Sequence, residues 1–178
     1  MERESASPQL FMRRPHLEDI PPIPNLSEGY GLRSYAEGDE KDLAQVLRDS
    51  FQDRAWTVDK VYSDLIIPKD VEEIYVATFK EIVVATASAR FLPGIYPGSG
   101  YLHWVGVHPD HRGKGLGRLV TLAVMHHFKG ANCRDTVLET DDFRIPAIKL
   151  YLSVGYQPEY RHPSHQERWE KILASFSK

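Results

Sequence analysis

The sequence has 178 residues, of which 42% are hydrophobic and 26% are charged, and this length and composition predict one soluble globular domain with its own core. A formal net charge of −3 at pH 7 excludes a generally basic nucleic-acid-binding surface, and the single cysteine, Cys133, excludes an internal disulfide and favours the cytoplasm. No apolar run approaches about 18 residues, so a membrane span is not expected.

The chain divides into two parts by composition. Residues 1–28 contain five prolines and show no helical period, which predicts an extended, proline-rich N-terminal arm. Five apolar side chains of this arm are candidates for attaching it to the body: Leu10, Phe11, Leu17, Ile20 and Ile23. Residues 29–178 alternate between the periods of strands and helices and are predicted to form one domain.

The predicted elements of the first half are, in chain order, a strand at 30–35, a helix beginning near Asp39 and carrying Leu43, Val46, Leu47 and Phe51, a weaker helix at 57–66, strands at 73–79 and 82–92, and a strand at 101–107. Only Lys80 and Glu81 separate the two strands at 73–79 and 82–92, which predicts a hairpin.

The predicted elements of the second half are a helix beginning within 108–117, a strand at 136–140, a helix between Pro146 and Gly155, a strand at 156–160, and a C-terminal helix that begins at Ser164 and extends to Phe176. Ser164 and Glu167 have the spacing of a capping box at the start of that last helix. The whole pattern is typical of a mixed α/β domain.

A basic, glycine-rich segment lies between the strand at 101–107 and the following helix. It reads Arg112-Gly113-Lys114-Gly115-Leu116-Gly117, and Arg118 follows. Glycines allow backbone N–H groups to approach an anion, and a helix N-terminus adds unpaired N–H groups and positive potential. The segment therefore predicts an anion site large enough for a pyrophosphate. Its spacing fits neither a P-loop nor a dinucleotide-binding Gly-x-Gly-x-x-Gly motif.

Two motifs together resemble the GCN5-related N-acetyltransferases (GNAT). Residues 107–117, Val-His-Pro-Asp-His-Arg-Gly-Lys-Gly-Leu-Gly, are similar to the family signature Arg/Gln-x-x-Gly-x-Gly/Ala after a strand that ends Val-x-Pro. Residues 147–151, Ala-Ile-Lys-Leu-Tyr, followed by Gly155-Tyr156, are similar to the family's Ala-x-x-Leu-Tyr…Gly-Phe/Tyr helix. The resemblance covers residues 101–160.

The resemblance implies a twisted, mostly antiparallel sheet with helices on both faces and one pair of parallel strands that splay apart, here 101–107 and 136–140. In such proteins acetyl-CoA, the cosubstrate, binds in the gap between these two strands. Backbone groups of Val105, Gly106 and Val107 would then pair with the pantetheine arm. The pyrophosphate would be held by a loop of seven residues: Arg112, Gly113, Lys114, Gly115, Leu116, Gly117 and Arg118.

The resemblance also assigns catalytic roles. Tyr151 would be the general acid that protonates the leaving thiolate, although the same tyrosine also fits the apolar face of its helix as a core residue. An amine with a pKa near 10.4 is protonated at pH 7, so a general base is expected. Glu139 is the first candidate, and His103 on the neighbouring strand is the rival. Each of them is also compatible with a packed or solvated side chain.

The sequence departs from the family pattern at two places. Arg144 stands where many relatives carry an asparagine that binds the pantetheine arm, so we expect it to contact a cofactor phosphate or an acidic substrate, or to pair with Asp141 or Asp142. A C-terminal helix replaces the usual strand hairpin near the acceptor. No metal site is expected, because the histidine pairs lack ligands at metal spacing.

Three functions remain open at this stage. The first is transfer of acetyl to a primary amine by direct attack; the others are a non-catalytic acyl-CoA-binding module, and transfer of another acyl group or transfer to a peptide N-terminus. Residues 39–70 contain both aromatic and acidic side chains and are the candidate acceptor region, for a cationic amine. Homodimerisation is common in the family, but the sequence does not decide it.

Overall fold

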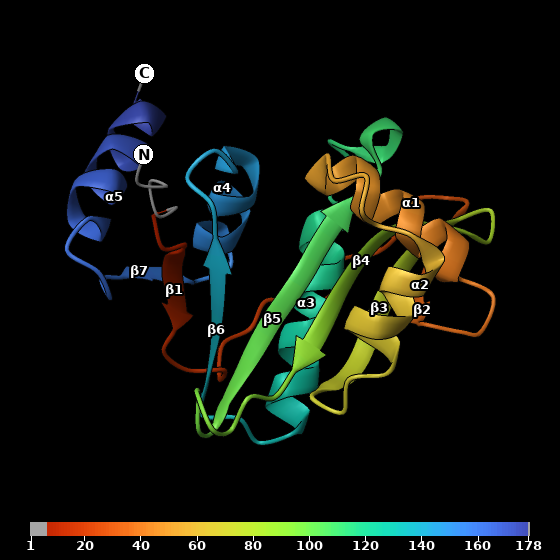
Figure 1. The fold of residues 1–178 in the computed structure, drawn as a ribbon, viewed down its shortest axis with the longest axis horizontal. Coiled ribbons are helices and arrows are strands. Elements are labelled where there is room, and N and C mark those ends of the chain that lie inside the picture. Colours follow the sequence, from red (N-terminus) through yellow and green to blue (C-terminus); the bar gives the residue numbers. More distant parts are fainter. Residues whose placement is uncertain (1–6, 178) are drawn as a thin grey trace, which may run out of the picture.

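The computed structural model describes residues 7–177, which form one seven-stranded sheet in the order β2-β3-β4-β5-β6-β1-β7 (Figure 1). The strands are β1 (Leu10–Arg14), β2 (Tyr30–Ser34), β3 (Val71–Phe79), β4 (Ile82–Arg90), β5 (Ser99–Val107), β6 (Asp135–Thr140) and β7 (Gln157–Glu159). The α-helices are α1 (Glu40–Phe51), α2 (Val58–Val61), α3 (Leu116–Gly130), α4 (Ile145–Ser153) and α5 (His165–Ala174). A π-helical turn, Tyr62–Ile66, continues α2, and short 3-10 turns lie at Pro109–His111 and Ser175–Ser177.

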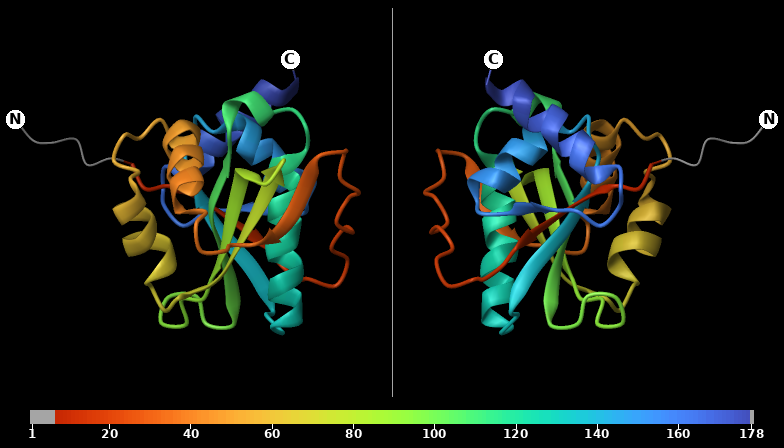
Figure 2. Two further views of the ribbon diagram at one scale, coloured as in Figure 1. Left: turned by 90° about the vertical axis from the view of Figure 1, so that its right-hand side faces the viewer. Right: turned by 90° about the vertical axis from the view of Figure 1, so that its left-hand side faces the viewer.

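The helices cover both faces of the sheet (Figure 2). Buried side chains of α1 and α2, including Leu47 and Val61, pack with Val76 of β3 on one face. Buried side chains of α3, α4 and α5 form the larger core on the other face with Leu102 and Leu138. The predicted mixed α/β fold, with helices on both faces and a C-terminal helix, is confirmed. None of the described helices is both long enough and apolar enough to cross a membrane.

The predicted hairpin is present between β3 and β4. Its two turn residues, Lys80 and Glu81, have φ angles of 48° and 70°. Positive φ at both central residues is the geometry of a two-residue type I′ turn, whose twist matches that of the flanking strands. The turn therefore directs β4 back along β3 over its full length.

The N-terminal segment contributes a strand to the sheet. β1 pairs antiparallel with both β6 and β7, so the first strand of the chain lies between two of the last. Leu10 and Met12 are buried in the larger core, and Phe11 between them is buried with Tyr101 and Val137, so both faces of β1 are covered. Residues 10–14, which the sequence analysis placed in an N-terminal arm, thus form an inner strand of the sheet. The following segment contacts α3, where Lys129 Nζ donates to the Glu18 carbonyl at 2.9 Å.

β5 and β6 are the parallel pair, and they separate. Within residues 7–177 they pair at Ser99 with Asp135, Gly100 with Thr136, and Tyr101 with Val137. Beyond these pairs the two strands diverge toward their C-terminal ends (Figure 1). The predicted splayed pair is therefore present.

β5 also carries a bulge on the side of β4. Thr86 lies opposite Gly106 and Ser88 opposite His103, so Trp104 and Val105 both face the single residue Ala87. Trp104 has a φ of 49°, which is rare for a bulky residue. A bulge redirects the side chains that flank it.

Substitution of Gly100 tests how tightly the chain is packed where β5 and β6 pair. A Cβ at this position would lie 2.3 Å from the Phe128 ring, and the ring has no room to move in the core. We expect Gly100→Ala to lower the free energy of unfolding by about 1–3 kcal/mol, as overpacking does. Urea denaturation measures the change. Gly94→Ala is the control, because no atom lies within 4 Å of the added Cβ; equal stability of the two variants would contradict the prediction.

Candidate active site

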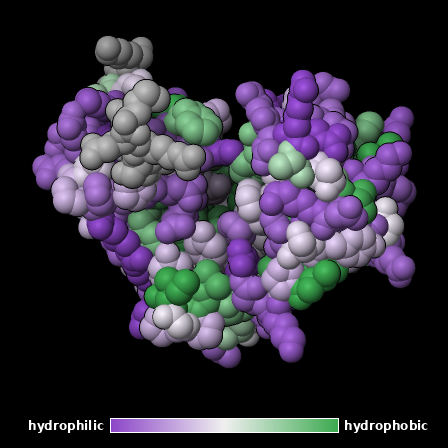
Figure 3. All heavy atoms as spheres, viewed as in Figure 1, coloured by the Kyte–Doolittle hydropathy of each residue, from purple (hydrophilic) through white to green (hydrophobic). Residues whose placement is uncertain are grey.

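A cleft of about 260 Å³ lies between the diverging ends of β5 and β6. The space-filling view shows the surface hollowed between the two halves of the molecule (Figure 3). The residues that line the cleft come from the N-terminal segment, α1, β5, β6, the β6–α4 loop and α4: Gln9, Phe51, Tyr101, Leu102, His103, Trp104, Val105, Glu139, Thr140, Asp141, Arg144, Ala147 and Tyr151.

The cleft is lined from both faces of the sheet. Leu102 and Tyr151 belong to the core on the α3, α4 and α5 face. Phe51 and Trp104 pack in the cluster on the α1 and α2 face. Because the strands have no partner across the gap, the cleft connects the two faces. Tyr151 and Glu139, which the sequence proposed as acid and base, are thus in one cleft.

Tyr151 projects from α4 and is 93% buried, with 7% of its surface exposed. Its ring contacts the Tyr156 ring edge-on at 5.9 Å between centroids. Burial raises the pKa of the Tyr151 phenol, and the charge of Arg144 opposes this effect. The phenol therefore stays protonated through neutral and mildly alkaline pH. Among the described residues its hydroxyl has no hydrogen-bond partner.

Glu139 projects from β6 with an exposed side chain. Two phenols donate to its carboxylate: Tyr96 to Oε1 and Tyr101 to Oε2, each at 3.2 Å. Each carboxylate oxygen retains a second lone pair that can accept a proton or an ammonium N–H. Burial, followed by the charge of Glu139, raises the pKa of Tyr101, so this phenol acts as a donor.

His103, the rival base, is not available as a proton acceptor. Arg90 Nη1 lies 3.0 Å from His103 Nδ1, and an arginine can only donate. Burial and the charge of Arg90 lower the pKa of His103 to about 3. The imidazole is therefore neutral at physiological pH, with its accepting nitrogen already occupied. This arrangement favours Glu139 over His103 as the base.

The glycine loop begins just after β5 and leads into α3. Gly113 and Gly115 have φ angles of 74° and 77°, so only glycine fits there without strain, and Gly115 is the N-cap of α3. The first backbone bond of the helix runs from the Leu119 N–H to the Gly115 carbonyl. In the described chain, no N–H of residues 113–115 donates to a backbone carbonyl, and the first turn of α3 leaves its own N–H groups free.

The loop is open to an anion and is close to α4. A Cβ at Gly113 or Gly115 would meet no atom within 4 Å, whereas one at Gly117 would lie 3.3 Å from Leu150. Arg118 also donates to Ser153 Oγ at 3.0 Å. Since Leu150 and Ser153 flank Tyr151, the loop lies next to the helix that carries the candidate acid.

Of the three residues predicted to pair with pantetheine through their backbone, only one lines the cleft. Val105 lines the cleft, but the Val107 carbonyl already accepts from Ser50 Oγ at 3.1 Å. Gly106 is buried against α1, where a Cβ would lie 2.9 Å from Ser50 Oγ.

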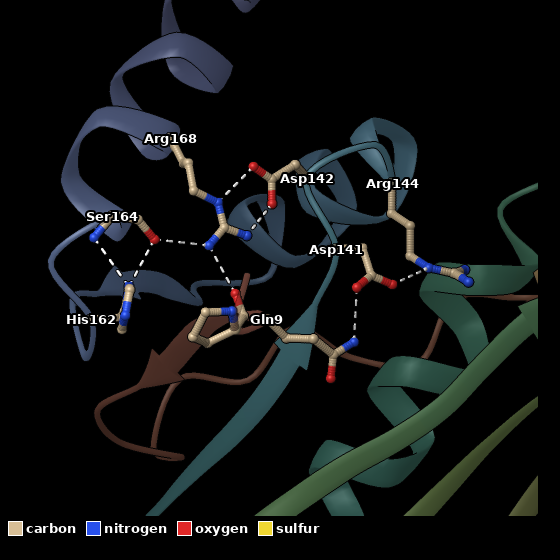
Figure 4. A network of polar contacts seen from close by, with 8 residues as sticks. Gln9, Asp141, Asp142, Arg144, His162, Ser164 and Arg168 are labelled. Carbon is tan, nitrogen blue, oxygen red and sulfur yellow. Dashed lines mark hydrogen bonds and ion pairs between the residues drawn. The ribbon is translucent and has the colours of Figure 1, made fainter. Parts of the chain in front are cut away.

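Arg144 lines the cleft from the β6–α4 loop, and contacts of Asp141 and Asp142 hold this loop (Figure 4). Its Nε donates to Asp141 at 3.3 Å, and Asp141 also accepts from Gln9 at 3.1 Å. Arg168 of α5 forms a bidentate pair with Asp142, with Nε to Oδ2 at 2.8 Å, and lowers the pKa of that carboxyl. From the sequence, Arg144 was predicted to contact either a ligand or one of these aspartates. In the structure it forms an ion pair with Asp141.

Two residues in or next to the cleft were missed by sequence reasoning. Gln9 lines the cleft but lies in a segment without helical period. Tyr96, which donates to Glu139, lies in a proline- and glycine-rich loop, so neither residue carried a signal. The Arg144 guanidinium stacks over Phe51 at 4.1 Å from the ring centroid, a contact between residues 93 positions apart.

Within residues 7–177 no three metal-binding side chains cluster.

Comparison with known proteins identifies relatives of this sequence. A mycothiol acetyltransferase of Actinosynnema mirum is 30% identical over 156 residues, which cover 83% of this chain and 51% of that protein. One from Thermomonospora curvata is 30% identical over 154 residues, covering 83% and 50%. The chain thus spans about half the length of the curated relatives that it matches.

Solved structures share the fold. A GCN5-related N-acetyltransferase of Sphaerobacter thermophilus superposes with a TM-score of 0.65 at 20% identity, over 85% of this chain and 49% of that one. One from Kribbella flavida gives 0.60 at 21% identity, over 86% and 55%. The model of the acetyltransferase (GNAT) family matches residues 40–156, which is more than half of the chain and includes the glycine loop and Tyr151. The chain belongs to this family.

Proposed function

We propose that this protein transfers the acetyl group of acetyl-CoA to a primary amine by direct attack. One observation carries the proposal: Tyr151 and Glu139 line the same cleft, and a glycine loop with free N–H groups lies next to the helix that carries Tyr151. Family membership supports the reaction class. The chain spans only about half the length of its curated relatives, so their acceptor is not carried over to this protein.

The glycine loop is the proposed binding site of the pyrophosphate. Free N–H groups at the start of α3 would bind phosphate oxygens, and the exposed cations Arg112 and Lys114 would add charge. The pantetheine arm would then enter the gap between β5 and β6, where Val105 has no strand partner on the β6 side. This path leads from the loop past Leu150 to Tyr151.

The cleft residues supply the two proton transfers that the reaction needs. Glu139 accepts one proton from the substrate ammonium. The neutral amine then forms a C–N bond with the acetyl carbonyl carbon, and its second proton passes to solvent. The C–S bond breaks, and the proton of the Tyr151 phenol goes to the leaving sulfur. The protonated Glu139 and the tyrosinate return to their starting states by exchange with solvent. No covalent intermediate on the protein is required.

The binding step is tested by titrating acetyl-CoA into the protein in a calorimeter. We expect Gly115→Val combined with Gly117→Val to weaken binding at least 10-fold, about 1.4 kcal/mol, because the first change strains the N-cap and the second crowds Leu150. Gly130→Val, at the other end of α3 in open space, is the matched control. Unchanged acetyl-CoA affinity in the folded double variant would refute the glycine loop as the pyrophosphate site.

Tyr151→Phe tests the general acid. We expect kcat to fall on the order of 100-fold with little change in acetyl-CoA affinity, because the phenol acts only on the leaving sulfur. Since the pKa of Tyr151 is raised, wild-type activity should not decline with pH through loss of this proton below about pH 10.

Thiol release measures the rate in that experiment. Tyr156→Phe is the matched control, because the Tyr156 hydroxyl pairs with Thr136 Oγ1 at 2.9 Å and lies outside the cleft lining. It should lower stability but leave kcat within about two-fold. A Tyr151→Phe enzyme as fast as wild type would refute the assignment.

Glu139→Gln tests the general base. The wild-type kcat/KM should rise with pH on the acid side, because a base must lose its proton before it can accept one. We expect the Gln variant to lose this limb and to be on the order of 100-fold slower at neutral pH. Glu159→Gln is the control, since Glu159 also pairs across β1 with Phe11 but does not line the cleft. An unchanged pH profile in Glu139→Gln would eliminate it.

A further inference from the structure

A chain of polar side chains runs from the protein surface to the cleft through β4 and β5. Asp70 accepts from Arg90 Nε at 2.9 Å and also pairs with Arg90 Nη2. Arg90 Nη1 in turn lies 3.0 Å from His103 Nδ1. Side chains of Asp70, Arg90 and His103 are all partly buried, so water competes weakly for these bonds.

This chain determines which imidazole nitrogen carries the proton. A guanidinium remains protonated and has no acceptor, so the contact with Arg90 requires a lone pair on His103 Nδ1. The neutral ring must then carry its hydrogen on Nε2. Asp70 holds Arg90 in place, as an outer partner holds a histidine tautomer in other sites.

The other nitrogen of His103, Nε2, is accessible and has no partner among the described residues. The ring of His103 lines the cleft. In the described chain Nε2 makes no hydrogen bond, and it is not one of the buried polar atoms without a partner, so it is accessible. The bulge in β5 packs the Trp104 ring against His103 at 4.5 Å, and Tyr101 packs on the same ring at 5.2 Å. The imidazole is therefore held between two aromatic rings, which limits its rotation.

We propose that His103 is a fixed hydrogen-bond donor for the acceptor substrate, and that this acceptor carries an oxygen close to its reacting amine. Tyr101 links the two groups involved: its hydroxyl bonds Glu139, and its ring packs on His103. An acceptor-only carboxylate therefore lies near a donor-only imidazole. Their complement is an ammonium with a neighbouring hydroxyl or carbonyl oxygen, as in amino alcohols, amino sugars and peptide N-termini. This inference rests on the proposed acetyl transfer.

Matched amines test the specificity. Ethanolamine and propylamine differ by one oxygen in place of one methyl group, and kcat/KM is measured for both. We expect His103→Phe to reduce the ratio of ethanolamine to propylamine about 10-fold, since a site built to bind an oxygen discriminates through that bond. His103→Gln, which keeps a donor, should restore most of the ratio. The different basicity of the two amines cancels, because the same pair is compared in each enzyme.

General damage to the site would lower both rates and leave the ratio unchanged, so an unchanged ratio in His103→Phe overturns the inference. Failure of wild type to acetylate any primary amine, despite binding acetyl-CoA, would instead overturn the proposed function. The two failures are therefore distinguishable.

A second readout does not depend on activity. Nitrogen-15 NMR of the wild-type protein should show His103 as the Nε2–H tautomer with no titration between pH 5 and 8. The charged groups that act on the ring are Arg90, Asp70 and Asp64. In the paired variant Arg90→Met with Asp70→Asn, nothing on Arg90 holds the lone pair of Nδ1, so the ring should show a mixture of the two neutral tautomers. An Nδ1–H tautomer, or titration near pH 6.5 in wild type, would refute the fixed donor.

Discussion

In the part of the chain that the structure describes, β5 and β6 are joined by three residue pairs, and the candidate site depends on this limit. A parallel pair that continued would close the sheet and leave no space between Tyr151 on one face and Glu139 on the other. Close packing of Gly100 against Phe128 holds the strands together at their N-terminal ends. Beyond that point their backbone groups have no partner across the gap, and an extended, amide-bearing ligand is their natural complement.

The two halves that border the cleft are stabilised in different ways. The β2–β5 half is held by long antiparallel pairing, with nine-residue strands from β3 to β5. The β6, β1 and β7 half has short strands, and both ends of the described chain, β1 and α5, complete it. β1 fills the sheet between β6 and β7, and Arg168 of α5 binds both the Pro8 carbonyl and Asp142. The ends of the described chain thus position the loop that carries Arg144 (Figure 4).

The bulge at Trp104 shapes the wall of the cleft formed by β5 and α1. Successive side chains of a regular strand point to opposite faces, yet His103 and Trp104 pack ring against ring. The positive φ of Trp104 makes this contact possible, and Phe51 and Trp56 then pack edge-on against Trp104. Strain of this kind is retained where surrounding packing enforces it, commonly at functional sites. The result is an aromatic wall that extends from Tyr96 to Phe51 and holds one imidazole.

The sequence by itself determined the local features: the type and order of the elements from residue 29 onward, the β3–β4 hairpin, the C-terminal helix and the glycine loop. These depend on periodicity and turn chemistry within a few residues. Only the tertiary structure decided that β1 lies between β6 and β7, that Gln9 lines the cleft, that Tyr96 donates to Glu139, and that Arg90 occupies the accepting nitrogen of His103. The reason is physical: strand pairing and a bulge join residues distant in sequence, and no local pattern records which partner they find.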